Sequence, residues 1–134
     1  MSKGFIQISK HYGFMKHNGG LMFKKLKNNK FQFKTKIKKK HLNKIGITHG
    51  GYIASIIDAG AGTGVYSVTK NKICVTISLD IKFIGSSRIG DEIIGNVNIQ
   101  KQTKSLVFAT CDLICKKKTI ASASGAWKKI NKIY

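Results

Sequence analysis

Apolar and polar residues follow two different periods along the chain. Residues 31–39 and 75–83 alternate between apolar and polar side chains, and this period of two predicts half-buried β-strands. Between them, residues 49–68 place apolar and small side chains three and four positions apart, which is helical spacing. The pattern therefore predicts strands before and after one long helix.

Turn residues divide the rest of the chain into further strands. Asn28-Asn29 separates a strand expected over 21–26 from the strand 31–39, as in a β-hairpin. After the helix and the strand 75–83, a turn at 85–90 leads to three more expected strands, 92–101, 105–115 and 120–130, the last two separated by a basic turn at 116–118. Consecutive strands without an intervening helix predict an antiparallel meander.

The first twenty residues show neither period clearly. They predict a short helix or an irregular lead-in that stops at Gly19-Gly20. Its apolar residues are expected to dock on the rest of the chain: Ile6, Tyr12, Phe14 and Met15.

The predicted helix, 49–68, contains glycines that weaken a free-standing helix by about 1 kcal/mol each relative to alanine. Packing must therefore hold it. A chain of 134 residues fits one domain, 1–134. We expect an α+β domain in which one antiparallel sheet wraps around one long central helix.

The net charge of +20 is the strongest deviation in the composition. Such an excess favours an anionic partner, which could be a nucleic acid, an anionic membrane surface or a polyanionic small ligand. Alternatively, lysine has simply replaced other polar residues over the surface. The lysines alternate with strand residues, and no arginine-plus-aromatic pattern is present, so the sequence does not favour nucleic-acid binding.

The cysteines and the longest apolar stretch indicate the compartment. Cys111 and Cys115 are four residues apart, roughly 13 Å in a strand, which is too far for a disulfide. With Cys74 the count is odd, and no Cys/His spacing resembles a metal site. Residues 1–10 lack the apolar run of a signal peptide, so secretion is not expected, and the stretch 50–68 carries Asp58 at its centre, which disfavours a membrane span. A cytoplasmic protein with reduced thiols and no metal is expected.

The segment 41–51, followed by Asp58, carries the candidate chemistry. Paired Gly50 and Gly51 at a helix start leave backbone N–H groups uncovered at the positive end of the helix dipole, where they can stabilise an oxyanion. Asp58 is a carboxylate in an otherwise apolar helix, so it must be partnered, solvent-facing or functional. His49 at the helix start caps or packs more often than it reacts.

The joint spacing of these residues resembles a known family. His49-Gly50-Gly51, an acid eight residues after the first glycine and Asn43 six before the histidine are similar to hotdog-fold thioesterases of the phenylacetate-degradation and 4-hydroxybenzoyl-CoA type. The strand pattern 76–83 extends the resemblance, which covers roughly residues 41–127. No single piece is specific, but the combination is.

The resemblance implies hydrolysis of an acyl- or aroyl-CoA thioester, with CoA as part of the substrate and no further cofactor. It implies that the Gly50 N–H polarises the carbonyl and that Asp58 acts as general base or nucleophile. Asn43 would orient the thioester or the water, and Thr76 would position the water. His49 is included with these catalytic candidates, and Gly51 is expected to contact the substrate.

The phosphates of CoA give part of the basic surface a candidate role. Arg88 and the turn Lys116, Lys117 and Lys118 are expected contacts for them. The chain departs from the family's pattern in its basic excess and in lacking the proline that commonly follows the pair Phe83-Ile84.

Two other functions fit the same fold. A non-catalytic acyl-CoA sensor would need no carboxylate at Asp58, and no helix-turn-helix segment precedes the sheet. A hydratase or dehydratase would use a His-acid pair close in sequence, which His49 and Asp58 do not match. Hydrolysis is therefore the preferred prediction.

Helix geometry predicts that the site is shared between two chains. Gly50 and Asp58 are eight residues apart, about 12 Å along the helix axis and about 80° around it. One thioester carbonyl cannot meet both residues of the same helix. The carboxylate would then come from a second subunit, and a two-fold axis would generate two equivalent sites. The family resemblance likewise implies a homodimer, often paired into a tetramer.

Overall fold

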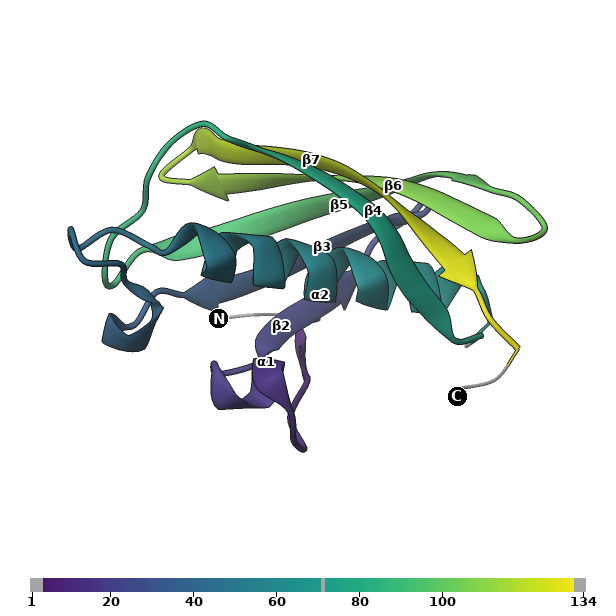
Figure 1. The fold of residues 1–134 in the computed structure, drawn as a ribbon, viewed down its shortest axis with the longest axis horizontal. Helices are drawn as coiled ribbons and strands as arrows, with labels where there is room; N and C mark the ends of the chain where they lie inside the picture. The colour runs from purple at the N-terminus through teal and green to yellow at the C-terminus, as the bar shows by residue number, and fades with distance from the viewer. Residues whose placement is uncertain (1–3, 71, 132–134) are drawn as a thin grey trace.

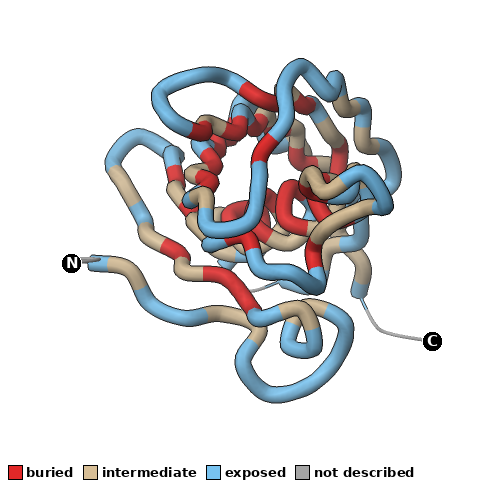
Figure 2. Tube along the Cα trace, turned by 90° about the vertical axis from the view of Figure 1, so that its left-hand side faces the viewer, coloured by how far each residue is buried: buried red, intermediate tan, exposed pale blue. Residues whose placement is uncertain are grey.

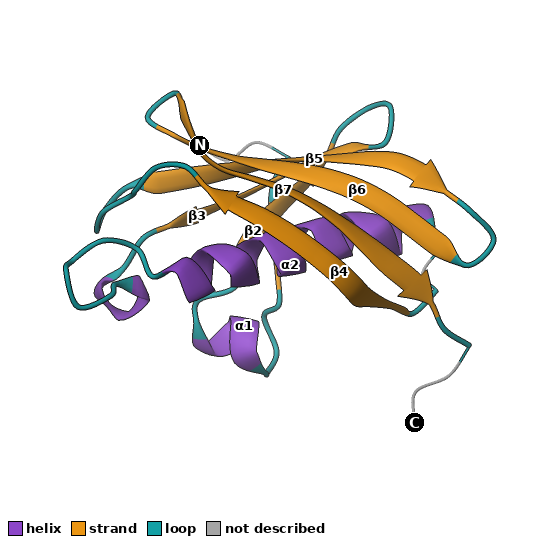
Figure 3. Cartoon of the chain, turned by 45° about the horizontal axis from the view of Figure 1, so that its top comes forward, coloured by secondary structure: helices purple, strands orange, loops and turns teal. Residues whose placement is uncertain are grey.

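One antiparallel sheet wraps around one long helix (Figures 1 and 3). The structure, a computed structural model, describes residues 4–70 and 72–131. Its elements are β1 (Ile6–Ile8), α1 (Phe14–His17), β2 (Leu21–Lys25), β3 (Lys30–Lys36), the 3₁₀ helix η1 (Lys39–His41), α2 (Gly50–Val68), β4 (Cys74–Phe83), β5 (Glu92–Gln102), β6 (Leu106–Cys115) and β7 (Lys118–Lys129). The expected α+β architecture is confirmed.

The sheet order is β1-β2-β3-β5-β6-β7-β4. The predicted meander is correct for β5, β6 and β7, but the prediction that β4 begins this meander is wrong. β3 pairs with β5, and β4 lies at the far edge of the sheet beside β7. The chain reaches that edge because α2 crosses the sheet between β3 and β4 (Figure 3).

The hairpin between β2 and β3 forms as its turn residues predict. Asn28 and Asn29 both adopt positive φ angles, 59° and 60°. Asparagine tolerates this left-handed conformation better than most residues, and two such residues in succession suit a tight hairpin turn. Lys116 and Lys117 adopt the same region, with φ of 49° and 66°, between β6 and β7.

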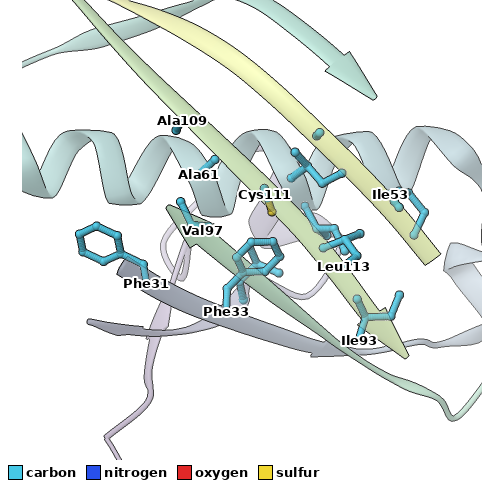
Figure 4. Close-up of a cluster of buried hydrophobic side chains, with 14 of the residues drawn as sticks. Phe31, Phe33, Ile53, Ala61, Ile93, Val97, Ala109, Cys111 and Leu113 are labelled. Atoms are coloured by element: carbon cyan, nitrogen blue, oxygen red, sulfur yellow. The ribbon is translucent and has the colours of Figure 1, made fainter. Parts of the chain in front are cut away.

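Close packing of the sheet against α2 explains how a glycine-rich helix persists. The Phe33 ring lies between Gly60 of α2 and Gly95 of β5, and a Cβ atom at either glycine would collide with it. Figure 4 shows Phe33 with Ala61, Leu113 and other buried side chains between the helix and the sheet. In Figure 2 the buried residues gather in the middle of the domain, and the outer loops are mostly exposed. Tertiary packing thus compensates for the poor intrinsic propensity of the glycines.

The apolar side chains that alternate along β4 are not all buried within this chain. A register shift between Thr76 and Ser78 changes which side chains face inward. Ile77 is 55% exposed and Phe83 is 58% exposed. Leu79, by contrast, packs against the core. The predicted strand is confirmed, but its apolar side chains are only partly covered by this chain.

The N-terminal lead-in contains a strand that the pattern did not predict, because β1 is only three residues long and is defined by its pairing with β2. Met15 packs against the core as expected. The docking predicted for Ile6, Tyr12 and Phe14 is wrong, because these side chains are largely exposed. The single turn of α1 directs only one side toward the domain.

The three cysteines are free thiols, and Cys111 and Cys115 are buried. Burial raises the pKa of the Cys111 thiol to about 12. Across residues 4–70 and 72–131, no helix is both long enough and apolar enough to cross a membrane.

Candidate active site

The first turn of α2 leaves one backbone donor without an internal partner. His49 is the N-cap, and its Nδ1 atom accepts the Gly51 N–H at 2.8 Å. The His49 carbonyl accepts the N–H groups of Tyr52 and Ile53. Within the described residues the Gly50 N–H has no acceptor. This donor therefore lies at the positive end of a 19-residue helix, where it can bind a developing negative charge.

The side chain of Asn43 has a fixed orientation just before the helix. Its Oδ1 atom accepts the backbone N–H groups of Ile45 and Ile47, at 3.0 and 3.2 Å. Because only the carbonyl end of the amide can accept these bonds, the Nδ2 group must point the other way. Asn43 is thus arranged as a hydrogen-bond donor.

A cavity of about 210 Å³ joins these two donors. Its walls come from the loop before α2, the helix start and the loop after β4: Asn43, Ile47, Thr48, Gly50, Ile53, Phe83, Gly85, Ser86 and Ser87. The Phe83 ring lies over Gly50, 3.6 Å from where a Cβ atom would be. The cavity therefore combines two polar donors with an apolar wall, an arrangement that suits the binding of a carbonyl group.

The loop after β4 is held in place by two buried hydroxyl groups that the sequence pattern did not single out. The hydroxyls of Thr48 and Ser87 are 2.6 Å apart, and the Ser87 carbonyl accepts the Thr48 N–H at 2.9 Å. Both residues are buried. This contact fixes the cavity wall against the start of α2, but it joins residues 39 positions apart and leaves no periodic signal in the sequence.

Asp58 and Thr76 form a second polar pair, separate from the cavity. The Thr76 hydroxyl donates to Asp58 Oδ1 at 2.6 Å, and both residues are exposed. Neither residue lines the cavity next to Gly50. The structure thus brings Asp58 together with Thr76, and Gly50 together with Asn43, but does not unite the two pairs within one chain.

Two of the predicted phosphate contacts lie at the rim of this region. Asp91 accepts the backbone N–H of Arg88 at 2.9 Å, and its other oxygen is 3.3 Å from the Lys116 ammonium. These contacts lower the pKa of Asp91, the Arg88 backbone N–H first and the Lys116 ammonium after it. Arg88 follows the cavity residue Ser87 directly. Lys117 and Lys118 are exposed on the adjoining turn.

His41 is a buried residue that the sequence analysis did not select. Its Nδ1 atom accepts the Lys38 N–H at 3.0 Å, so the proton lies on Nε2, which donates to the Asn18 carbonyl at 2.9 Å. Its ring stacks on Tyr52 with centroids 3.8 Å apart. Burial lowers the pKa of His41.

The backbone of His41 reaches the start of α2. The His41 carbonyl accepts the His49 N–H at 2.8 Å. His41 therefore joins the N-terminal segment to the residue that caps α2. A lone histidine in a polar loop gives no sequence signal for such a role.

The described residues hold no group of three or more His, Cys, Asp and Glu side chains arranged as metal ligands.

The pattern of the thioesterase superfamily matches residues 45–122, more than half of the chain. The chain belongs to this superfamily. Acyl-coenzyme A thioesterase 13 of Mus musculus is similar to it, with 32% identity over 78 residues, which are 58% of this chain and 56% of the mouse protein. The similarity thus spans little more than half the length of that relative.

Solved structures place this superfamily member in the hotdog fold. Zebra fish thioesterase superfamily member 2 superposes with a TM-score of 0.82 at 23% identity, covering 91% of this chain and 90% of that one. The phenylacetic acid degradation protein PaaI of Thermus thermophilus gives 0.78 at 15% identity, covering 87% and 98%. The predicted family and fold are confirmed.

Proposed function

We propose that this chain hydrolyses acyl-CoA or aroyl-CoA thioesters to the free acid and CoA. The observation that carries the proposal is the free Gly50 N–H at the positive end of α2, in a cavity that also holds the Asn43 amide. Membership of the thioesterase superfamily supports this reaction, and the name of the mouse relative supports acyl-CoA as the substrate class.

Gly50 and Asn43 act on the thioester carbonyl. Both present N–H donors, and two such donors stabilise the negative charge that develops on the carbonyl oxygen during attack. The amide orientation of Asn43 supports a donor role for its Nδ2 group. The Phe83 ring covers Gly50 and excludes water from one side of the carbonyl, which strengthens both hydrogen bonds.

Asp58 activates the water. Its carboxylate takes a proton as the water oxygen bonds to the acyl carbon; the carbon–sulfur bond then breaks, and the proton passes to the leaving thiolate. Thr76 holds one carboxylate oxygen, so the other oxygen is available for the water. Direct attack by the same carboxylate on the acyl carbon would require the same placement.

The two polar pairs meet only if a second chain contributes one of them. Asp58 lies about 12 Å further along the axis of α2 than Gly50, and about 80° around it. We therefore propose a two-fold homodimer in which the partner's Asp58 and Thr76 complete the cavity formed by Gly50 and Asn43.

The exposed edge of β4 supports this dimer. No described strand pairs with the outer edge of β4. Large apolar side chains are exposed on this strand and on the segments that flank it: Ile73, Val75, Ile77, Phe83, Ile84 and Ile89. An exposed edge strand of this length and composition has unpaired backbone groups that can pair with a strand of another chain.

Antiparallel pairing of β4 with its copy brings the two polar pairs together. If the two-fold axis passes near Leu79, at the middle of the strand, the partner's Thr76 lies opposite Lys82 of the first chain. That position is next to Phe83, which lines the cavity with Gly50. One strand residue spans about 3.4 Å, so the partner's carboxylate comes within reach of the thioester.

Arg88 and the turn from Lys116 to Lys118 bind the phosphates of CoA in this proposal. The loop residues Ser86 and Ser87 lead from the cavity to Arg88, and Asp91 ties Arg88 to Lys116. The nucleotide end of CoA would therefore follow the loop after β4 away from the reacting carbonyl.

The direct test is release of free thiol from a panel of short, long and aromatic acyl-CoAs. The account predicts turnover well above spontaneous hydrolysis for at least one class. No thiol release from any of them by a folded dimeric protein would overturn it, and binding of acyl-CoA without turnover would favour the sensor.

A further inference from the structure

The N-terminal segment exposes two aromatic side chains that neither the core nor the candidate site uses. Tyr12 is 89% exposed and Phe14 is 66% exposed. Met15, the next residue, packs against the core instead. Two exposed aromatic residues this close in sequence are a candidate binding surface.

Hydrogen bonds hold this segment against the domain. The Asn18 carbonyl accepts from His41 Nε2 at 2.9 Å, and the His17 carbonyl accepts from Lys40 Nζ at 2.8 Å. In Figures 1 and 3, α1 lies on the side of α2 that faces away from β5, β6 and β7. Tyr12 and Phe14 are therefore presented on a fixed projection.

The charged side chains in this part of the sequence have one sign. Residues 1–57 contain thirteen lysines and no Asp or Glu. Lys10 and Lys16 flank the aromatic pair in sequence. The Lys40 ammonium donates to the carbonyl of His17, three residues after Phe14. The charge therefore favours an anionic partner and disfavours pairing with a second copy of the same segment.

We propose that this N-terminal surface, made of Lys10, Tyr12, Phe14, Lys16 and Lys40, docks on the face of an anionic lipid bilayer. Aromatic side chains favour the boundary between headgroups and acyl chains, while lysines extend their ammonium groups to the lipid phosphates. A phosphate backbone alone would bind the lysines but would not bury Phe14.

None of the five residues of this surface belongs to β4, the strand proposed to pair the two chains. β1 and β4 lie at opposite edges of the sheet. A dimer through β4 would therefore carry two such surfaces, and two weak attachments reinforce each other. The proposal does not depend on hydrolysis, since vesicle binding is measured without turnover.

The test is co-sedimentation of the full chain with vesicles of phosphatidylcholine alone or with about 30% phosphatidylglycerol, a content that gives a negative surface potential. Binding is expected only to the anionic vesicles and should weaken with salt. Lys10→Gln with Lys16→Gln should lower the partition coefficient by about fivefold for each lysine. Tyr12→Ser with Phe14→Ser should lower it by about tenfold or more.

Matched controls separate a specific surface from net charge. Lys101→Gln with Lys104→Gln removes the same charge near the turn between β5 and β6, and should change binding much less. Equal losses in both lysine pairs, or an aromatic variant that binds like the wild type, would contradict the proposal. Tighter binding to single-stranded nucleic acid than to anionic vesicles, lost in the same aromatic variant, would reassign the surface.

Discussion

The Thr76 hydroxyl donates to Asp58 Oδ1 at 2.6 Å and joins the edge strand β4 to the central helix α2. This contact fixes the carboxylate on the exposed side of the helix while its second oxygen stays available. The orientation of Asp58 therefore depends on a residue from a different element.

Replacing Asp58 by asparagine tests the carboxylate. Asp58→Asn is expected to lower kcat for thiol release by about 10² to 10⁴, the range for a positioned acid–base group, without changing the fold. Cys111→Ser is the control, because Cys111 is buried away from the site and should affect stability only. A folded Asp58→Asn protein with near-normal kcat would remove Asp58 from the mechanism.

Thr76 should act through Asp58. Thr76→Ala removes a hydrogen bond to a charged group, a change of about 1.5 to 3 kcal/mol, so kcat should fall about tenfold to a hundredfold. Thr76→Ser keeps the hydroxyl and should restore most of the rate. If alanine and serine reduce kcat equally, the hydroxyl has no part in orienting the carboxylate.

The basic rim predicts a particular salt response. If Arg88 and the turn Lys116 to Lys118 bind the phosphates, KM should rise with salt while kcat changes little, because exposed charges are screened over about 8 to 10 Å. Arg88→Gln should raise KM by up to about fivefold. Lys104→Gln is the control at a distant turn. If KM changes neither with salt concentration nor in Arg88→Gln, these residues do not bind the phosphates of the substrate.

His41 should make stability depend on pH. Burial lowers the pKa of His41 in the folded protein, whereas the unfolded chain binds its proton near the ordinary value of about 6.5. The free energy of unfolding should therefore be highest above that pH and fall as the pH decreases toward the folded pKa, by at most about 1.4 kcal/mol per unit.

The measurement is urea unfolding between about pH 8 and pH 5, with His41→Gln as the comparison, because unfolded histidine titrates within this range. Glutamine keeps a donor for the Asn18 carbonyl but cannot titrate. Its slope should be smaller than that of the wild type. Identical slopes would mean that His41 does not couple protonation to folding.

Local features were predictable from the sequence because local chemistry fixes them. The turn at Asn28-Asn29 needs residues that accept positive φ, and both adopt it. The helical spacing of 49–68 matched α2, and the pair of glycines after His49 matched its first turn. Period and turn chemistry act over a few residues, so the pattern records them directly.

Long-range features were not predictable in the same way. The place of β4 beside β7 depends on where α2 returns the chain, and the contact between Thr48 and Ser87 joins distant loops. The exposed Ile77 shows a further limit, because an apolar strand has the same pattern whether its own core or another chain covers it.

The candidate site consists of two halves, and the proposal that two chains share it can be tested in mixed dimers. Gly50 and Asn43 line one cavity, whereas Asp58 lies outside it with Thr76. Asn43→Ala and Asp58→Asn should each be inactive alone. In a dimer of one chain of each kind, one of the two sites retains both functional residues.

The decisive measurement is activity after subunit exchange between Asn43→Ala and Asp58→Asn chains. Random exchange makes about half of the dimers mixed, so roughly a quarter of wild-type thiol release should return. Mixing wild type with the double variant should leave about a quarter of wild-type activity for a shared site, but about half for a site within one chain. No recovery in the first mixture and half activity in the second, with exchange demonstrated, would contradict a site shared between two chains.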